Sequence, residues 1–288
     1  QETKVDKFKN KERMIKSFLI PLCFWISKKA DKKRPYFVGL AGGQGTGKTT
    51  ISSLIKIILT RYFKLKVFKI SIDDFYKTRK ERLSLSNRIH PMLLTRGVPG
   101  THDINMMLNF FRKVKSKKFK KLKLPTFNKA IDDRFNKKKW YNLRNKPDVI
   151  IFEGWCVGAK SEKNSSLKKT INSMEKVKDQ KQIWRKYVNQ QLKLKYKNLY
   201  SQLSCLIYLK AKNFNLLQQW RLKQERKLWV NSKKKTNLKI MNKNDVINFM
   251  QTYQRITQNM FKHTPKYASI IFKLDNKHQI SSAIYKKK

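Results

Sequence analysis

One short segment constrains the fold of this chain more than any other. Residues 42–49 read Gly-Gly-Gln-Gly-Thr-Gly-Lys-Thr and fit the pattern G-x-x-x-x-G-K-[ST] at every fixed position. An apolar run at 36–41 predicts a buried strand before the segment, and the apolar residues within 51–62 share one helical face after it. A glycine loop between a strand and a helix lets backbone N–H groups surround phosphate oxygens. The context favours a nucleoside triphosphate site over a plain glycine-rich turn.

Two side chains of this segment have the chemistry that such a site needs. Lys48 can reach the β- and γ-phosphates of a nucleotide, and the Thr49 hydroxyl can ligate Mg²⁺. We therefore expect ATP and Mg²⁺ as cofactors. The predicted cofactor-binding residues are Gly42, Gly43, Gln44, Gly45, Thr46, Gly47, Lys48, Thr49 and Thr50.

The remaining sequence alternates between strand and helix patterns. The predicted strands are 36–41, 66–72, 149–152, 205–209 and 269–274, the last in the chain, with a short extended piece at 121–127. The predicted helices are 1–30 (with a break at Pro21 as an alternative), 51–63, 103–115, 180–202, 213–230 and 245–261. This alternation predicts a three-layer α/β/α fold with a mainly parallel sheet, whose ligands bind at the carboxyl ends of the strands.

The 288 residues allow one large or two small domains. We expect an N-terminal helical segment at 1–34 and one nucleotide-binding domain at 35–288, with a helical lid or insertion at about 158–235. Residues 77–100 predict a loop with at most one short helix, and residues 128–147 a basic loop.

Carboxylates follow two of the predicted strands at the edge where a ligand is expected. Asp73 and Asp74 end the strand at 66–72, where one of them could accept a proton from an acceptor hydroxyl. The plainer interpretation is a turn or helix-capping aspartate. Glu153 ends the apolar strand that follows Asp148, and an acid there can hold Mg²⁺ directly or through water.

A basic helix near 219–227 is a further candidate element. Lys223 and Lys227 lie on one helical face, and Arg221 lies two residues before Lys223. Such a helix can close over a transferring phosphate as a lid. A solvated helix face explains the same pattern.

The formal net charge of +51 is extreme and has two interpretations. One is a polyanionic partner, either nucleic acid or a membrane surface. The other is drift in composition, because the lysines are spread along the whole chain and fall between predicted elements. We favour drift, and we expect neither a specific nucleic acid nor a membrane as partner.

The cysteines and the apolar segments bear on location. Cys23, Cys156 and Cys205 are odd in number, and their spacing fits neither a zinc site nor a disulfide framework, which indicates reduced thiols in a reducing compartment. The apolar run at 18–26 is too short to span a bilayer, and no small-residue cleavage site precedes the basic cluster at 28–34. We expect a cytoplasmic protein; the sequence does not specify an oligomeric state.

The chain resembles the D-glycerate 3-kinase family of plants, fungi and bacteria, within the P-loop kinases that include uridine kinase, phosphoribulokinase and pantothenate kinase. The order of matching motifs is collinear from about residue 35 to 280. These motifs lie at 43–50, 71–76 (Ser-Ile-Asp-Asp-Phe-Tyr), 96–103 (Arg-Gly-Val-Pro-Gly-Thr-His-Asp), 124–134, 151–158 (Ile-Phe-Glu-Gly-Trp-Cys-Val-Gly), 184–189, 208–211, 220–225 and 249–257.

The resemblance implies ATP-dependent phosphorylation of D-glycerate to 3-phosphoglycerate by a P-loop kinase domain. It implies catalytic roles for Lys48, Asp73 and Arg221, with Thr49 and Glu153 on the metal. Asp103 takes the position of an acid that holds substrate hydroxyls, and a cation must bind the substrate carboxylate. The substrate-binding candidates are Asp74, Tyr76, Arg96, His102, Asp103, Lys129 and Arg134, of which Arg96, Lys129 and Arg134 are the candidates for the carboxylate.

Three alternatives stay open. A related kinase could act on pantothenate, a nucleoside or another sugar acid. A basic, nucleic-acid-associated P-loop ATPase would explain the charge, although the chain has no recognition module of a known type. A regulatory ATP-binding protein that has lost catalysis is disfavoured because Lys48, Asp73 and Glu153 are all present.

Overall fold

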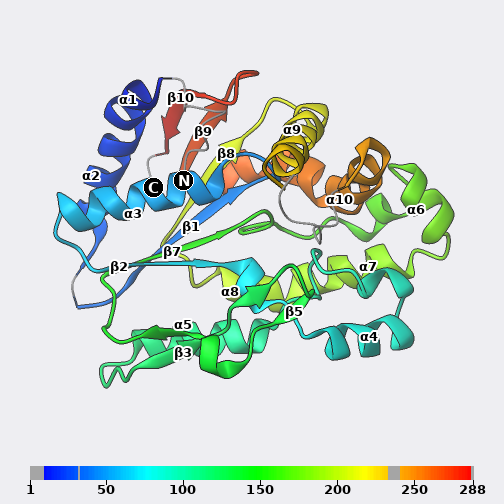
Figure 1. Ribbon diagram of the computed structural model, residues 1–288, viewed down its shortest axis with the longest axis horizontal. Helices are drawn as coiled ribbons and strands as arrows, with labels where there is room; N and C mark the ends of the chain where they lie inside the picture. Colours follow the sequence, from blue (N-terminus) through cyan, green and yellow to red (C-terminus); the bar gives the residue numbers. More distant parts are fainter. Residues whose placement is uncertain (1–9, 32, 233–240, 287–288) are drawn as a thin grey trace.

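The computed structural model describes residues 10–31, 33–232 and 241–286. Its centre is a six-stranded sheet with the order β10-β9-β8-β1-β7-β2 (Figure 1). The strands are β1 (Tyr36–Gly42), β2 (Val67–Ser71), β7 (Val149–Gly154), β8 (Cys205–Lys210), β9 (Ile270–Leu274) and β10 (Ile280–Tyr285). All neighbouring pairs are parallel except β9 and β10, which are antiparallel. The predicted mainly parallel sheet is confirmed.

The side chains of the inner strands alternate between two hydrophobic cores, one on each face of the sheet. In β1, Phe37 and Ala41 belong to one core, and Val38 and Leu40 belong to the other. A strand that is buried on both faces needs a continuous apolar run rather than an alternating one, because successive side chains point to opposite faces. Helices therefore cover both faces, as the predicted three-layer fold requires.

The first core lies beneath helices α5 and α7, the π-helical segment after α7, and part of α10. The second core lies beneath α2, α3 and α9. The helices are α1 (Lys11–Met14), α2 (Ile20–Lys29), α3 (Lys48–Arg61), α4 (Arg79–Arg88), α5 (Ile104–Lys115), α6 (Ser173–Lys178), α7 (Ile183–Gln191), α8 (Lys197–Tyr200), α9 (Phe214–Ser232) and α10 (Lys243–Tyr267). π-Helical turns link α1 to α2 at Ile15–Leu19 and α7 to α8 at Leu192–Tyr196.

Several boundaries differ from the prediction. Strand β10 was missed, because its residues are half exposed and include two serines, so the strand lacks an apolar run. Pro21 does not break the N-terminal helix; it is the second residue of α2 and follows the π-helical turn at Ile15–Leu19. The segment at 77–100, predicted as a loop with at most one short helix, contains α4, ten residues long, which a Thr78–Glu81 capping box begins.

The N-terminal helices and the range 158–235 both share the main cores. Leu22 and Ile26 of α2 pack with the apolar face of α3, so residues up to 29 contribute to the same core as the glycine-loop helix. The range 158–235 contains α6 to α9, but it also contains β8, which lies next to β1 in the middle of the sheet.

The predicted basic loop at 128–147 is partly ordered as small antiparallel pairs. Strand β3 (Leu122–Leu124) pairs with β6 (Tyr141–Leu143), and β4 (Phe127–Asn128) pairs with β5 (Asp133–Arg134). These pairs hold the segment from 122 to 143 outside the main sheet. They bring Lys129 and Arg134 close to the end of β2, through contacts described below.

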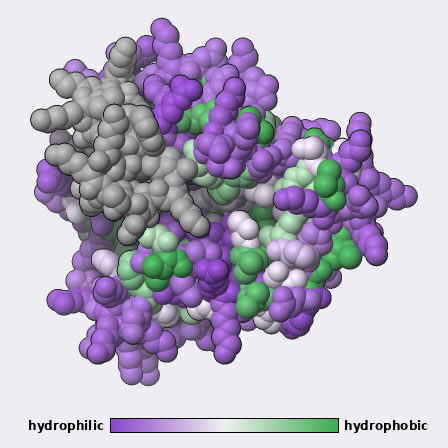
Figure 2. Space-filling view, turned by 45° about the vertical axis from the view of Figure 1, so that its right-hand side comes forward, coloured by the Kyte–Doolittle hydropathy of each residue, from purple (hydrophilic) through white to green (hydrophobic). Residues whose placement is uncertain are grey.

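The surface follows the composition. Figure 2 shows hydrophilic side chains over most of the visible face, with hydrophobic ones in separate groups. The spread of charge agrees with lysines that occur along the whole sequence. No helix among the described residues combines the length and the apolar character that a bilayer crossing requires.

Candidate active site

The glycine loop joins β1 to α3, as its sequence predicts. Gly45 and Gly47 have positive φ angles of 79° and 82°, a backbone region that glycine enters without strain. The carbonyl oxygen of Gly43 accepts hydrogen bonds of 2.9 Å from both Lys48 Nζ and Thr46 Oγ1. The loop is therefore held in a curve, with the Lys48 ammonium group folded across it.

The candidate metal ligands lie next to one another. Parallel pairing of β1 with β7 places Glu153 beside Leu40, two residues before the loop. The hydroxyl of Thr49, in the first turn of α3, donates to Glu153 Oε1 over 3.1 Å. A hydroxyl and one carboxylate, with water and phosphate oxygens, suit Mg²⁺, which is commonly bound through few protein ligands. These two residues fit a nucleotide-bound Mg²⁺.

Asp73 lies in the 3₁₀ turn at 72–75 that directly follows β2. Its carboxylate accepts hydrogen bonds from Lys129 Nζ over 2.7 Å and from the Tyr76 hydroxyl over 3.0 Å. Burial alone raises the pKa of Asp73, but Lys129 and the hydrogen bonds outweigh it and hold the pKa below its usual value. Asp73 is thus an ionised acceptor beside the loop, and its charge also reaches Lys48.

Asp74 points back into its own turn. Its Oδ2 accepts from the backbone N–H of Ser71, and the Ser71 hydroxyl caps the same turn from the other side. Burial raises the pKa of Asp74 to about 6. The geometry is that of a capping carboxylate, so the two adjacent aspartates have different surroundings.

Several of the residues predicted to bind the acceptor are connected to Asp73 by hydrogen bonds and ion pairs. Asp103 caps α5 through Met106 N, and its other oxygen pairs with Arg134 Nη2 at 3.2 Å. The Nε of Arg134 also donates to the Tyr76 carbonyl oxygen over 2.7 Å. Tyr76, Asp103, Lys129 and Arg134 therefore form one connected group around Asp73.

Arg96 has a different partner. Its guanidinium pairs with Asp132, which also pairs with the fully buried Arg82 at 2.9 Å. Both arginines lie within 6 Å of the Phe127 ring centroid, at 5.9 and 5.5 Å. A bound acceptor has to compete with Asp132 for Arg96.

His102 is buried, with 2% of its surface exposed, and stacks on Tyr76 with ring centroids 4.4 Å apart. Its Nδ1 lies 2.6 Å from the Tyr196 hydroxyl oxygen, and that oxygen accepts a hydrogen bond from Gly100 N over 3.0 Å. Burial lowers the pKa of His102 to about 3. The imidazole is therefore neutral at every pH where the protein is expected to work.

This shift predicts a pH dependence of stability. The pKa of His102 is about 3 in the folded protein, and its ordinary value is 6.5. Below pH 6.5 the unfolded chain therefore binds a proton that the folded chain does not, so the free energy of unfolding decreases as the pH is lowered. Between pH 7 and 5 we expect wild type to lose roughly 2 kcal/mol more unfolding free energy than His102→Gln, measured by urea titration. Asp74, with its raised pKa, acts in the opposite direction but is common to both proteins. Parallel curves for the two proteins would contradict the assignment of a neutral His102.

Arg221 lies on α9, the predicted lid helix, and is held by neighbours. Its guanidinium pairs with Glu225 one turn along and lies 5.5 Å from the Phe249 ring centroid. Lys223 is exposed on the same helix, and the side chain of Lys227 lies outside the described residues. Any phosphate that Arg221 bound would have to compete with Glu225 for its guanidinium group.

Sequence patterns missed Tyr253 as a site residue, since its helical spacing marked it as core. A Cβ at position 97 would lie 2.3 Å from the Tyr253 hydroxyl oxygen, so this hydroxyl packs directly on Gly97. Trp155 supports it edge-on at 4.8 Å. Burial and the Asp73 charge raise the pKa of Tyr253, whereas Arg96 and Arg221 oppose the shift.

Trp220 and His278 flank the glycine loop and were also missed. Their rings stack at 4.3 Å with an interplanar angle of 24°. A Cβ at Gly45 would lie 3.1 Å from Trp220 Cβ, and one at Gly47 would lie 3.7 Å from His278 Nε2. His278 belongs to the turn before β10, so its position depends on the strand that the sequence did not reveal.

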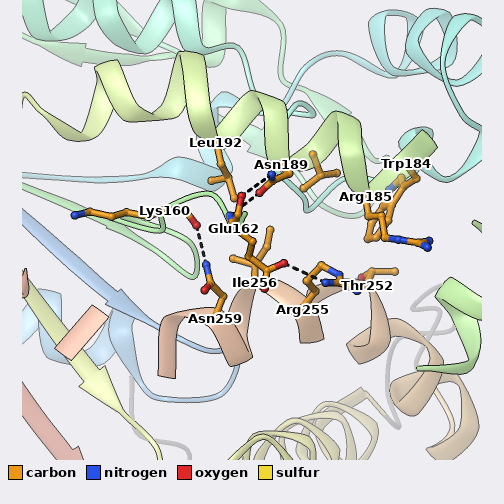
Figure 3. A pocket seen from close by; sticks show the side chains of 11 residues that line it. Lys160, Glu162, Trp184, Arg185, Asn189, Leu192, Thr252, Arg255, Ile256 and Asn259 are labelled. Carbon is orange, nitrogen blue, oxygen red and sulfur yellow. Dashed lines mark hydrogen bonds and ion pairs between the residues drawn. The ribbon is translucent and has the colours of Figure 1, made fainter. Parts of the chain in front are cut away.

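A small cavity of about 20 Å³ lies elsewhere, between α7 and α10 (Figure 3). Arg255 on one side pairs with Glu162 and Glu175, and Arg185 on the other pairs with Asp179. Its volume is about that of one water molecule, and its two arginines are already paired with carboxylates. The cavity belongs to a polar network that joins the segment before α7 to α10, rather than to a substrate site.

Comparison with known proteins agrees with the geometry. No protein-family model matches the chain. An uncharacterized kinase of Schizosaccharomyces pombe is 29% identical over 257 residues, which cover 85% of this chain and 84% of that protein. The chloroplastic D-glycerate 3-kinase of Arabidopsis thaliana is 26% identical over 226 residues, 72% of this chain but only 47% of the plant protein.

Among solved structures, D-glycerate 3-kinase from Cryptococcus neoformans superposes with a TM-score of 0.77 at 21% identity, covering 95% of this chain and 98% of that one. The predicted P-loop kinase fold is therefore confirmed. So is the resemblance to D-glycerate 3-kinases. By its sequence and its fold, the chain is a relative of the P-loop small-molecule kinases, which are phosphotransferases acting on alcohol groups.

Proposed function

We propose that this relative of the P-loop kinases uses ATP and Mg²⁺ to phosphorylate D-glycerate to 3-phosphoglycerate. The observation that carries the proposal is the cluster at the carboxyl ends of β1, β2 and β7. There Lys48, the Thr49–Glu153 pair and the ionised Asp73 lie beside a group of acceptor-side cations. Similarity to two D-glycerate 3-kinases supports the choice of acceptor.

The residues suggest an in-line transfer. The loop amides and Lys48 hold the β- and γ-phosphates and neutralise their charge. Asp73 accepts the proton of the acceptor hydroxyl, and the hydroxyl oxygen forms a bond to the γ-phosphorus. The bond between the γ-phosphorus and ADP breaks, so the products are the phosphorylated acceptor, ADP and a proton on Asp73. Thr49 and Glu153 would hold Mg²⁺, which would supply charge neutralisation for the phosphates. Arg221 would complete the site from the lid helix once it leaves Glu225.

The acceptor side suits a small hydroxy acid. A carboxylate needs a cation, and Lys129 and Arg134 are the nearest cations to Asp73 along its hydrogen-bond network. Lys129 is the more exposed of the two, with 63% of its side chain accessible, compared with 10% for Arg134. Asp103, which pairs with Arg134, would accept a hydrogen bond from an acceptor hydroxyl.

A panel of acceptors tests the proposal. We expect ADP release from ATP to depend on D-glycerate, and phosphorus NMR to show the new ester on the 3-hydroxyl. L-Glycerate, pantothenate, uridine and two longer sugar acids are the comparison compounds, at the same ATP and Mg²⁺ concentrations. No release above background with D-glycerate would reject the named acceptor, and turnover of another compound would identify the alternative.

The second candidate function is a nucleic-acid-associated ATPase. The observation that favours it is the net charge of +51. Binding that depends on phosphate contacts weakens steeply with salt. We expect no binding of single- or double-stranded DNA or RNA at about 150 mM salt in a fluorescence polarisation assay. ATPase activity that nucleic acid stimulates at this salt concentration would favour the second candidate over the kinase.

A further inference from the structure

We propose that Tyr196 fixes the tautomer of His102, so that its Nε2 carries the proton and donates a hydrogen bond to an oxygen of the bound acceptor. This rests on the proposed kinase function, because it names a contact in the same site. Neither Tyr196 nor the tautomer follows from the sequence motifs. The argument depends on which atoms can donate and which can accept.

The chain of hydrogen bonds has a fixed direction. A backbone N–H can only donate, so Gly100 N donates to the Tyr196 oxygen at 3.0 Å. The hydroxyl proton of Tyr196 then needs an acceptor, and His102 Nδ1 lies 2.6 Å away. If Nδ1 carried the proton instead, the buried hydroxyl of Tyr196 would lose the acceptor that the structure provides. Nδ1 is therefore the acceptor, and the neutral imidazole holds its proton on Nε2.

The backbone is shaped for this contact. Tyr196 ends the π-helical segment at 192–196, a wide turn of the kind often found at functional sites. Gly100 has a φ of 103°, and a Cβ there would lie 2.6 Å from the Tyr187 ring. Glycine at this position lets its N–H approach the tyrosine oxygen.

The other ring nitrogen is the part that points to a ligand. His102 Nε2 is buried and has no hydrogen-bond partner among the residues that the structure describes. A buried donor without a partner costs roughly 1–3 kcal/mol. A residue that only filled the core would be expected to satisfy this group or to be apolar. An acceptor oxygen supplies the missing partner.

The surroundings locate this donor in the acceptor site. His102 stacks on Tyr76, whose hydroxyl donates to Asp73, and the Asp73 charge reaches the imidazole directly. Asp103, the next residue, holds Arg134. A neutral N–H among these charges can bind a carboxylate or hydroxyl oxygen without taking the proton that Asp73 has to accept. His102 is thus a specificity contact, and Tyr196 is a positioning residue.

Imidazole spectra test the tautomer without any turnover. The chain has four histidines, so nitrogen-15 labelling resolves His102 by comparison with His102→Gln. We expect the pattern of an Nε2-protonated neutral ring that does not titrate between pH 8 and 5, and a shift of Nε2 when D-glycerate is added. In Tyr196→Phe we expect a mixture of tautomers. A proton on Nδ1, or titration within this range, overturns the proposal.

Kinetics test the contact. We expect Tyr196→Phe to raise KM for D-glycerate at least about tenfold, the effect of one buried hydrogen bond to a charged group, with KM for ATP within about twofold. Tyr285→Phe is the matched control, because Tyr285 lies on β10 with 39% of its surface exposed. We expect it to leave both KM values unchanged. His102→Gln, whose amide reaches the Nε2 position, retains a lower KM than His102→Asn, whose amide does not.

Failures of the two proposals are distinguishable. Wild-type protein that turns over no D-glycerate rejects the proposed function, while the spectra still decide the tautomer, and the kinetic comparison moves to the acceptor that the panel identifies. If Tyr196→Phe loses the single His102 tautomer but keeps the wild-type KM for D-glycerate, the contact between His102 and the acceptor is rejected. Thermal unfolding of each variant shows whether a raised KM reflects lost folding.

Discussion

Lys48→Ala is expected to lower kcat by about a thousandfold or more, while the protein still folds. The ammonium group lies across the curve of the loop and donates to Gly43 O. In the transition state the same group would stabilise charge that develops on the β- and γ-phosphates. Alanine keeps a good helix former at the first position of α3 but removes that charge.

Two controls isolate the charge. Lys56→Ala removes a lysine further along α3 and is expected to leave kcat within about twofold, because surface substitutions away from a site have small effects. Lys48→Arg keeps the charge in a bulkier, planar group and is expected to recover little activity. The measurement is steady-state ADP release, with circular dichroism to show the fold. Turnover within tenfold of wild type in Lys48→Ala would remove the loop from catalysis.

The fold could be predicted because its signals are local. The glycine pattern, the apolar runs of the inner strands and the spacing of α3 and α5 each identify an element without reference to the rest of the chain. Strand β10 could not be predicted in this way. Half of its residues face solvent, and its pairing with β9 decides its conformation.

Some residues of the candidate site could likewise be predicted from local motifs, and others could not. Lys48, Thr49 and Asp73 lie within or next to motifs, so their proximity follows from parallel strands that end at one edge. Tyr196 and Tyr253 lie on helices far along the chain and reach the site only through tertiary packing. Their spacing is that of core residues. Packing brings the hydroxyl of Tyr196 to Gly100 and the hydroxyl of Tyr253 to Gly97.

Asp73→Asn is expected to lower kcat by roughly a hundredfold to ten-thousandfold, the range for loss of a general base, with little change in ATP affinity. Asparagine keeps the shape of the side chain and can still accept from Tyr76, so the turn after β2 should persist. It cannot take a proton from the acceptor hydroxyl. The measurement is kcat with saturating acceptor, together with ATP binding by calorimetry.

The neighbouring variant Asp74→Asn sharpens this test, because the two residues are adjacent and differ mainly in what they contact. Asp74 caps its own turn through Ser71 N, so its replacement is expected to cost about 1 kcal/mol of stability and to affect kcat much less than Asp73→Asn. Lys129 holds the pKa of Asp73 below its usual value, so we expect Asp73 to stay ionised, and wild-type kcat/KM to show no Asp73 titration, in the neutral range. Equal losses of kcat in both variants would assign the chemistry to the pair, and retained turnover in Asp73→Asn would remove it as the base.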